Sequence, residues 1–224
     1  MKKFLLAAVI LFAIQACSDN TGIKDPEPPE PPEIPTIDPE IGVVIANIKG
    51  DLSENINKVS FLARYYTQNP DVDWGVMLTI PFEKDATTLI FPVDPPAELF
   101  GNITDDIPDG FVISDPEAKT IAFTEFAFHE SDELKRVYGV FKQMKTDGKI
   151  WYEVQYIYCD RPVKISGVSK DWWRNTTTYD LTLKKGWNLT VRKEDTTTAT
   201  KTVTISKEVP EGIEWICDYW IGGR

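Results

Sequence analysis

The sequence predicts an all-β fold, which we expect to be an antiparallel β-sandwich of the immunoglobulin-like or jelly-roll-like kind, built as one unit or as two packed β units. Apolar and polar residues alternate with the period of two that strands require, as in the segment KVSFLARYY at residues 58–66. Such alternating runs follow one another at the short, regular spacing that is typical of sandwiches and barrels. A helical period is hard to find along the chain.

About eleven or twelve strands are expected from these runs. They are expected at residues 41–48, 58–66, 75–80, 87–91, 119–130, 136–144, 149–159, 162–169, 177–183, 187–193, 200–206 and 212–219. Asp147 and Gly148 predict a tight hairpin turn between two of them. Residues 93–110 carry prolines and acidic residues and predict a long loop, with a domain division near residue 110 as one option. Helical turns are expected only near residues 96–101 or 131–136.

The N-terminus predicts an exported lipoprotein. Lys2 and Lys3 precede an unbroken apolar stretch, Phe4 to Ile14, which has the length of a secretory signal and is too short to span a bilayer. The stretch ends in IQAC, which resembles the lipobox of bacterial lipoproteins. That resemblance implies a signal peptide over residues 1–16 and a lipid on Cys17.

Residues 17–40 predict a tether between the lipid and a β domain at residues 41–224. Proline and glutamate alternate there, so the segment is expected to be an extended spacer of roughly 45 Å. The serine and aspartate after Cys17 partly resemble the export signal of surface lipoproteins of the Bacteroidetes. We therefore expect a lipid-anchored protein of the outer membrane, on its periplasmic or its external face.

Charge excludes one class of partner. The chain has 24 basic and 35 acidic residues, a formal net charge of −11, and removal of Lys2 and Lys3 makes it 22 − 35 = −13. A chain this acidic would repel phosphates, so no nucleic acid partner is expected. Cys159 and Cys217 lie in strand-like segments, and either a disulfide or two buried thiols fits them in an oxidising compartment. Cysteine and histidine spacing predicts no metal site, and no cofactor is expected.

The C-terminal part contains a pattern of three elements. An aromatic-rich strand leads into VKISG, then comes LTLKKGWN, and a last strand carries Trp215. This pattern resembles one found in uncharacterised lipoproteins of the Bacteroidetes. The resemblance implies the compartment and the β fold, and no activity comes with it.

DWWRN is the best candidate binding site. Neighbouring residues of a strand face opposite sides, so Trp172 and Trp173 cannot both lie in a core if this segment is extended. An exposed indole gives a flat apolar surface for a sugar ring or a protein, and Asp171 and Arg174 can add polar contacts. The alternative is that both tryptophans cover the end of the sandwich. In LKKGWN, Gly186 predicts a tight turn and Trp187 a core residue.

Catalysis has little support in the sequence. His129 is the only histidine and is expected to be solvated at a strand end, and no nucleophile or phosphate-binding motif occurs. The motif DTT resembles an O-glycosylation signal of exported proteins of the Bacteroidetes, with Thr196 as acceptor. We expect a non-catalytic module that binds a glycan or a protein at the outer membrane. The alternatives are a structural subunit with an unpaired edge strand and a hydrolase that uses two carboxylates.

Overall fold

The computed structural model describes residues 42–52, 55–64, 74–107, 110–122, 124–129 and 137–219. The predicted signal, Cys17 and the tether lie outside these residues. The chain divides into two units at residue 34, and residues 34–224 form the larger compact unit. No helix in the part of the chain that the structure describes is long and apolar enough to cross a membrane.

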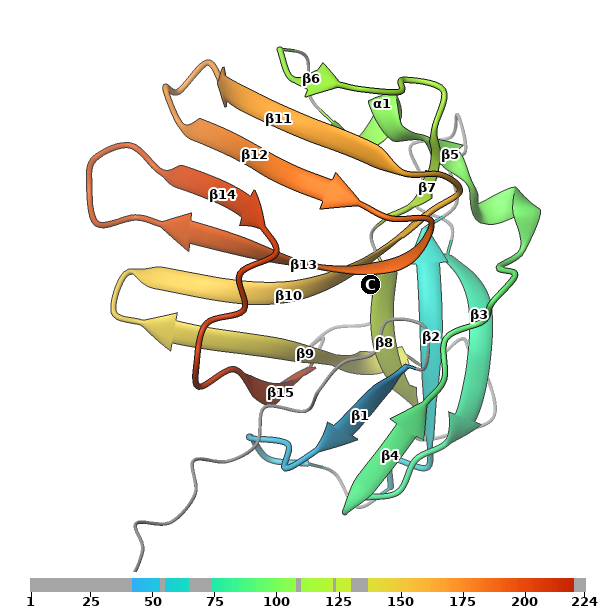
Figure 1. The fold of residues 1–224 in the computed structure, drawn as a ribbon. Coiled ribbons are helices and arrows are strands. Elements are labelled where there is room, and N and C mark those ends of the chain that lie inside the picture. Colours follow the sequence, from blue (N-terminus) through green and yellow to red (C-terminus); the bar gives the residue numbers. More distant parts are fainter. Residues whose placement is uncertain are drawn as a thin grey trace, which may run out of the picture. The chain divides into compact units, whose positions relative to one another are not determined.

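The described chain is almost entirely β, as predicted, and it contains fifteen strands (Figure 1). They are β1 (Val43–Ala46), β2 (Lys58–Arg64), β3 (Trp74–Pro81), β4 (Ala86–Leu89), β5 (Gly101–Asn102), β6 (Val112–Ile113), β7 (Lys119–Ile121), β8 (Thr124–His129), β9 (Val137–Asp147), β10 (Ile150–Cys159), β11 (Val163–Lys170), β12 (Thr176–Leu183), β13 (Gly186–Asp195), β14 (Thr202–Ser206) and β15 (Glu214–Tyr219). A 3₁₀ turn (Ala97–Leu99) lies in the predicted helical region, and the short helix α1 (Ile103–Asp106) was not predicted.

Thirteen strands form one long sheet, and β1 and β4 form a separate antiparallel pair. The main path of the long sheet runs β3-β2-β8-β9-β10-β13-β14-β12-β11-β6. All of its pairs are antiparallel except β12 with β14, which are parallel. Strands from both sides of residue 110 belong to this sheet, since β2 pairs with β8 and β5 pairs with β7.

One face of the long sheet carries the main aromatic core. Phe61 stacks on Phe91 and Phe126 with ring centroids 4.8 and 5.1 Å apart, and Trp187 lies 5.2 Å from Phe61. The β1–β4 pair packs its buried residues into this core and so covers it. Stacked and edge-to-face ring pairs of this kind add to the burial free energy of each ring.

The opposite face carries two smaller apolar clusters. The larger joins β11, β12 and β14 through Ile165, Leu181 and Ile205, and α1 packs Ile103 against it. The smaller consists of Leu62, Ala127 and Val140 on β2, β8 and β9, with Trp74 against it. The two faces follow from the period of two along each strand, which the sequence predicted.

Two predicted turns are present. The β9–β10 hairpin pairs Asp147 with Ile150, so its two loop residues are Gly148, at a φ of 60°, and Lys149. Gly186 opens β13 at a φ of 94°, a backbone conformation in which glycine has no steric cost. Trp187 follows it and is buried in the main core, where its indole Nε1 donates to the Pro92 carbonyl at 2.9 Å.

The predicted option of a disulfide is wrong. Cys159 and Cys217 are both free thiols. Alternation along β10 places Cys159 in the cluster of β11, β12 and β14, where its thiol donates to the Arg161 carbonyl. Cys217 on β15 packs against the main aromatic core on the other face of the sheet. The two thiols therefore cannot meet.

Candidate functional site

A cleft of about 510 Å³ opens where the long sheet splits. At one end of β10, residues Ile150 to Glu153 pair with β9, and at the other end Tyr158 and Cys159 pair with β7. Between these two ends β10 has no partner on that side among the described strands. A volume of this size is in the range of small-molecule sites in proteins.

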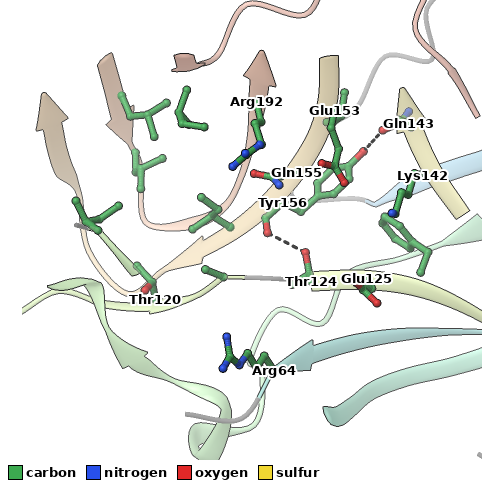
Figure 2. Close-up of a pocket in the computed structure, with 18 of the residues that line it drawn as sticks. Arg64, Thr120, Thr124, Glu125, Lys142, Gln143, Glu153, Gln155, Tyr156 and Arg192 are labelled. Carbon is green, nitrogen blue, oxygen red and sulfur yellow. Dashed lines mark hydrogen bonds between the residues drawn. The ribbon is translucent and has the colours of Figure 1, made fainter. Parts of the chain in front are cut away.

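The cleft has an apolar part and a polar part. The apolar part is the cluster of β11, β12, β14 and α1, together with Trp74 on the opposite side. The polar part lies on β2, β8, β9, β10 and β13, and Figure 2 shows its side chains around a common space. They are Arg64, Glu125, Lys142, Glu153, Gln155 and Arg192.

Buried hydrogen bonds hold the split in place. The Tyr156 hydroxyl donates to Oε1 of Gln143 at 2.6 Å, and the Thr124 hydroxyl donates to the Tyr156 carbonyl at 2.9 Å (Figure 2). Burial raises the pKa of Tyr156 far above its ordinary value, so the phenol keeps its proton and remains a donor. The polar groups on β8, β9 and β10 are thus fixed before any ligand arrives.

Two of the three cations of the polar part, Lys142 and Arg192, have acidic partners in the described chain. Lys142 Nζ lies 2.9 Å from Asp218 Oδ2, and this partner outweighs burial and raises the pKa of Lys142. Arg192 lies 2.8 Å from Glu194 Oε2 and shares that carboxylate with Lys201. Neither cation forms an ion pair with a glutamate of the cleft in the described chain.

The two glutamates of the cleft lack such partners. The Oε2 atom of Glu125 is buried and accepts no hydrogen bond within the described residues. Burial raises the pKa of Glu125. The negative charges of Glu153 and Asp218 raise this pKa further, and the positive charge of Lys142 opposes the rise. Burial also raises the pKa of Glu153, against the opposing charges of Lys142 and Arg192. An orphaned buried acceptor is costly, so the site has an unmet demand for a hydrogen-bond donor.

The predicted DWWRN site lies elsewhere, at the turn between β11 and β12. Trp172 is 92% exposed and Trp173 is 76% exposed, so the alternative in which both cover the sandwich is wrong. Both are exposed because the segment is a turn and not a strand. Arg174 is exposed beside them, while the carboxylate of Asp171 accepts from the backbone N–H and the side-chain amide of Asn175.

His129 differs from its prediction. It is 2% exposed, and its Nε2 lies 2.9 Å from the Ser60 hydroxyl, which in turn lies 2.7 Å from the Thr79 hydroxyl. Burial and the charge of Lys58 lower the pKa of this histidine. Ser60 is also fully buried, so this serine–histidine pair is a structural contact that a substrate cannot reach.

Thr196 is exposed in the loop after β13, and its hydroxyl donates to the Lys149 carbonyl at 2.9 Å. Its glycosylation stays a prediction. No group of three histidine, cysteine, aspartate or glutamate residues in the described ranges is arranged to hold a metal ion.

The residues of the cleft could not be predicted from the sequence. Glu125 and Glu153 occupy alternate positions in strands whose other face is aromatic, so each reads as an ordinary solvent-facing residue. Only the curvature of the sheet and the split beside β10 bring them to one space. Comparison of the chain with protein-family models, curated proteins and solved structures finds no match. The function is therefore argued from the geometry of the cleft.

Proposed function

We propose that this chain is a lipid-anchored, non-catalytic binding protein of the outer membrane, attached through Cys17, and that its ligand is a glycan-type molecule held in the cleft. The ligand has an apolar body, which contacts the cluster of β11, β12 and β14, and a sugar or polyol head, which contacts the polar part. The observation that carries the proposal is the orphaned Oε2 atom of Glu125.

The head group is inferred from what the polar part lacks. Glu125 Oε2 needs a donor, and a sugar hydroxyl supplies one together with oxygens that accept from Gln155 or Arg192. A carboxylate head at neutral pH brings no proton to donate and is repelled by Glu125 and Glu153. An ammonium head brings donors but meets Lys142 and Arg192, which already have carboxylate partners. A neutral head with many hydroxyls avoids both penalties.

Isothermal titration calorimetry of residues 34–224 with three probes that share a hexyl chain tests this proposal. The probes are hexyl β-glucoside, hexanoate and hexylamine. We expect saturable binding of the glucoside and weaker or no binding of the two charged probes. Trp74 lines the cleft, so its fluorescence gives a second readout of the same event.

Two variants make the test specific. Glu125→Gln keeps the shape of the side chain but places an amide where the carboxylate was, and we expect it to weaken glucoside binding about tenfold or more. Glu208→Gln changes an exposed glutamate outside the cleft and is expected to bind like the parent. A parent that binds only hexanoate, or a Glu125→Gln variant that binds normally, would contradict the proposal.

A hydrolase is a second candidate because the cleft holds two carboxyl groups. Burial raises the pKa of Glu125 and the charge of Glu153 adds to the rise, and an acid with a raised pKa near a second carboxylate is the arrangement that glycosidases use. A panel of aryl glycosides tests this candidate. Turnover by the parent that is lost in both Glu125→Gln and Glu153→Gln would favour the hydrolase, and binding without turnover would favour the binding protein.

The third option, a structural subunit, predicted an unpaired edge at the first strand. In the structure β1 pairs with β4 over four residues. The Val44 carbonyl, which lies within β1, accepts a hydrogen bond from the Trp215 indole at 2.9 Å. This edge is therefore less open to strand addition by a partner than the sequence suggested.

A further inference from the structure

The turn between β11 and β12 presents two large apolar side chains to solvent. Trp172 and Trp173 are the most and the third most exposed of the large hydrophobic residues, at 92% and 76%, and Val93 is the second at 77%. Residues 170–175 are called the tryptophan tip below. Adjacent exposed tryptophans contribute little to folding, so their presence at a protruding turn points to a contact outside this chain.

The tryptophan tip is fixed by hydrogen bonds. The Asp171 N–H donates to the Asn175 carbonyl, and the Arg174 N–H donates to the Asp171 carbonyl, both at 3.0 Å. The Asn175 side chain accepts from the Lys201 N–H in the neighbouring loop. Arg174 holds a φ of 65°, which is unfavourable for a residue with a side chain. A turn held this firmly presents its tryptophans at a small entropic cost of binding.

The tip is locally basic in an acidic chain. Lys170 and Arg174 flank the tryptophans and are exposed, and they outnumber the single carboxylate of Asp171, which is held by Asn175. The whole chain has a net charge of −11. Two indoles between two cations match the interface of a bilayer, where tryptophan lies at head-group depth and Lys or Arg contacts anionic head groups.

The size of the tip favours a membrane over a protein. A tryptophan buries at most about 250 Å², so the two together bury less than the roughly 800 Å² per partner of a stable protein interface. A membrane contact needs no matched partner surface of that area, because tryptophan side chains are accommodated at head-group depth one by one.

We propose that the tryptophan tip inserts into the head-group region of an anionic phospholipid bilayer, as a second membrane contact beside the proposed lipid on Cys17. The proposed tether of roughly 45 Å is as long as the diameter of a globular unit of this size, about 40 Å, so the tip can reach the membrane from any side of the unit. This contact is independent of the cleft and its ligand.

Vesicle co-sedimentation of residues 34–224, without the lipid anchor, tests the proposal. This unit contains all three apolar clusters of the described chain. The probes are vesicles of phosphatidylcholine alone and of phosphatidylcholine with phosphatidylglycerol. We expect binding to the anionic vesicles, about fivefold tighter than to the neutral ones because the tip has one net positive charge, from two basic residues and one acidic residue. Lipids brominated near the head group are expected to quench the tip tryptophans.

Matched variants distinguish insertion of the two tryptophans from non-specific adsorption to vesicles. Trp172→Ser with Trp173→Ser is expected to abolish binding and the quenching, whereas Val93→Ser removes an equally exposed apolar side chain outside the tip and is expected to change neither. Lys170→Gln with Arg174→Gln is expected to remove the preference for anionic lipid. All substituted residues are exposed, and circular dichroism checks that each variant is folded. No vesicle binding by the parent, or equal binding by the double serine variant, would overturn the proposal.

Discussion

Replacement of Glu125 by glutamine is expected to make the protein more stable while it weakens the proposed ligand binding. In the folded chain this side chain has a buried oxygen without a donor, and burial raises its pKa. An unsatisfied buried acceptor costs about 1–3 kcal/mol and more when it is charged, and glutamine removes the charge although its amide has no partner there either. Because the rest of the side chain is only partly buried, we expect the lower end, about 1 kcal/mol, which corresponds to about 3 °C in Tm for a domain of this size.

The gain in folding stability from Glu125→Gln depends on pH, and the raised pKa of Glu125 determines whether it grows or shrinks as the pH rises. The folded chain holds the Glu125 proton more tightly than the unfolded chain does, so this group favours folding below its unfolded pKa of about 4.3. That contribution is lost as the pH rises through the folded pKa. Glutamine has no such loss, so the stability advantage of Glu125→Gln is expected to be smaller at pH 4 than at pH 7.

Urea unfolding followed by tryptophan fluorescence at both pH values measures this difference. Glu208→Gln, which removes an exposed carboxylate, is the control and is expected to match the parent at both. A Glu125→Gln variant that is less stable than the parent at pH 7, or that gains as much at pH 4 as at pH 7, would refute the reasoning.

Three further predictions concern the core and the thiols. Trp187→Phe is expected to cost about 2 kcal/mol in urea unfolding, since the Pro92 carbonyl loses its donor and the smaller ring leaves a gap; an unchanged midpoint would contradict the packing described. In folded residues 34–224 without reductant, iodoacetamide is expected to alkylate Cys217 faster than Cys159, because Cys159 is buried. Mass spectrometry of the same residues after denaturation is expected to show two adducts, whereas a disulfide would give none. Because the pKa of His129 is lowered, the parent is expected to lose stability as the pH falls below about 6.5, and His129→Gln is expected to lack that part of the decline.

Most of the fold could be predicted from the sequence, because a strand is marked by the alternation of its own residues. Alternation in residues 58–66 and the glycines at positions 148 and 186 depend on neighbours in the chain, and the structure contains the corresponding strands and turns. The short elements β5, β6 and α1 were not predicted, because a strand of two residues carries no period. His129 was predicted to be solvated from the acidic residues that follow it, but the sheet buries its side chain.

Only part of the candidate site could be predicted from the sequence. Their adjacency indicated that Trp172 and Trp173 could not both be core residues of a strand, but both are exposed because the segment is a turn. The cleft could not be predicted because it depends on contacts between distant strands. Glu125 and Lys142 are neighbours because β8 pairs with β9, and Glu153 reaches the same space from β10, which exchanges β9 for β7 along its length. That exchange of partners leaves no trace in local composition.

Amide chemical shifts of isotope-labelled residues 34–224 during titration with hexyl β-glucoside locate the bound ligand. A ligand in the cleft is expected to give saturable shifts that cluster on the strands around the split, at Glu125, Lys142, Glu153 and Arg192, with none at the tryptophan tip. Shifts confined to residues 170–175 would move the glycan contact to the tip. The absence of saturable shifts anywhere would contradict a ligand of this class.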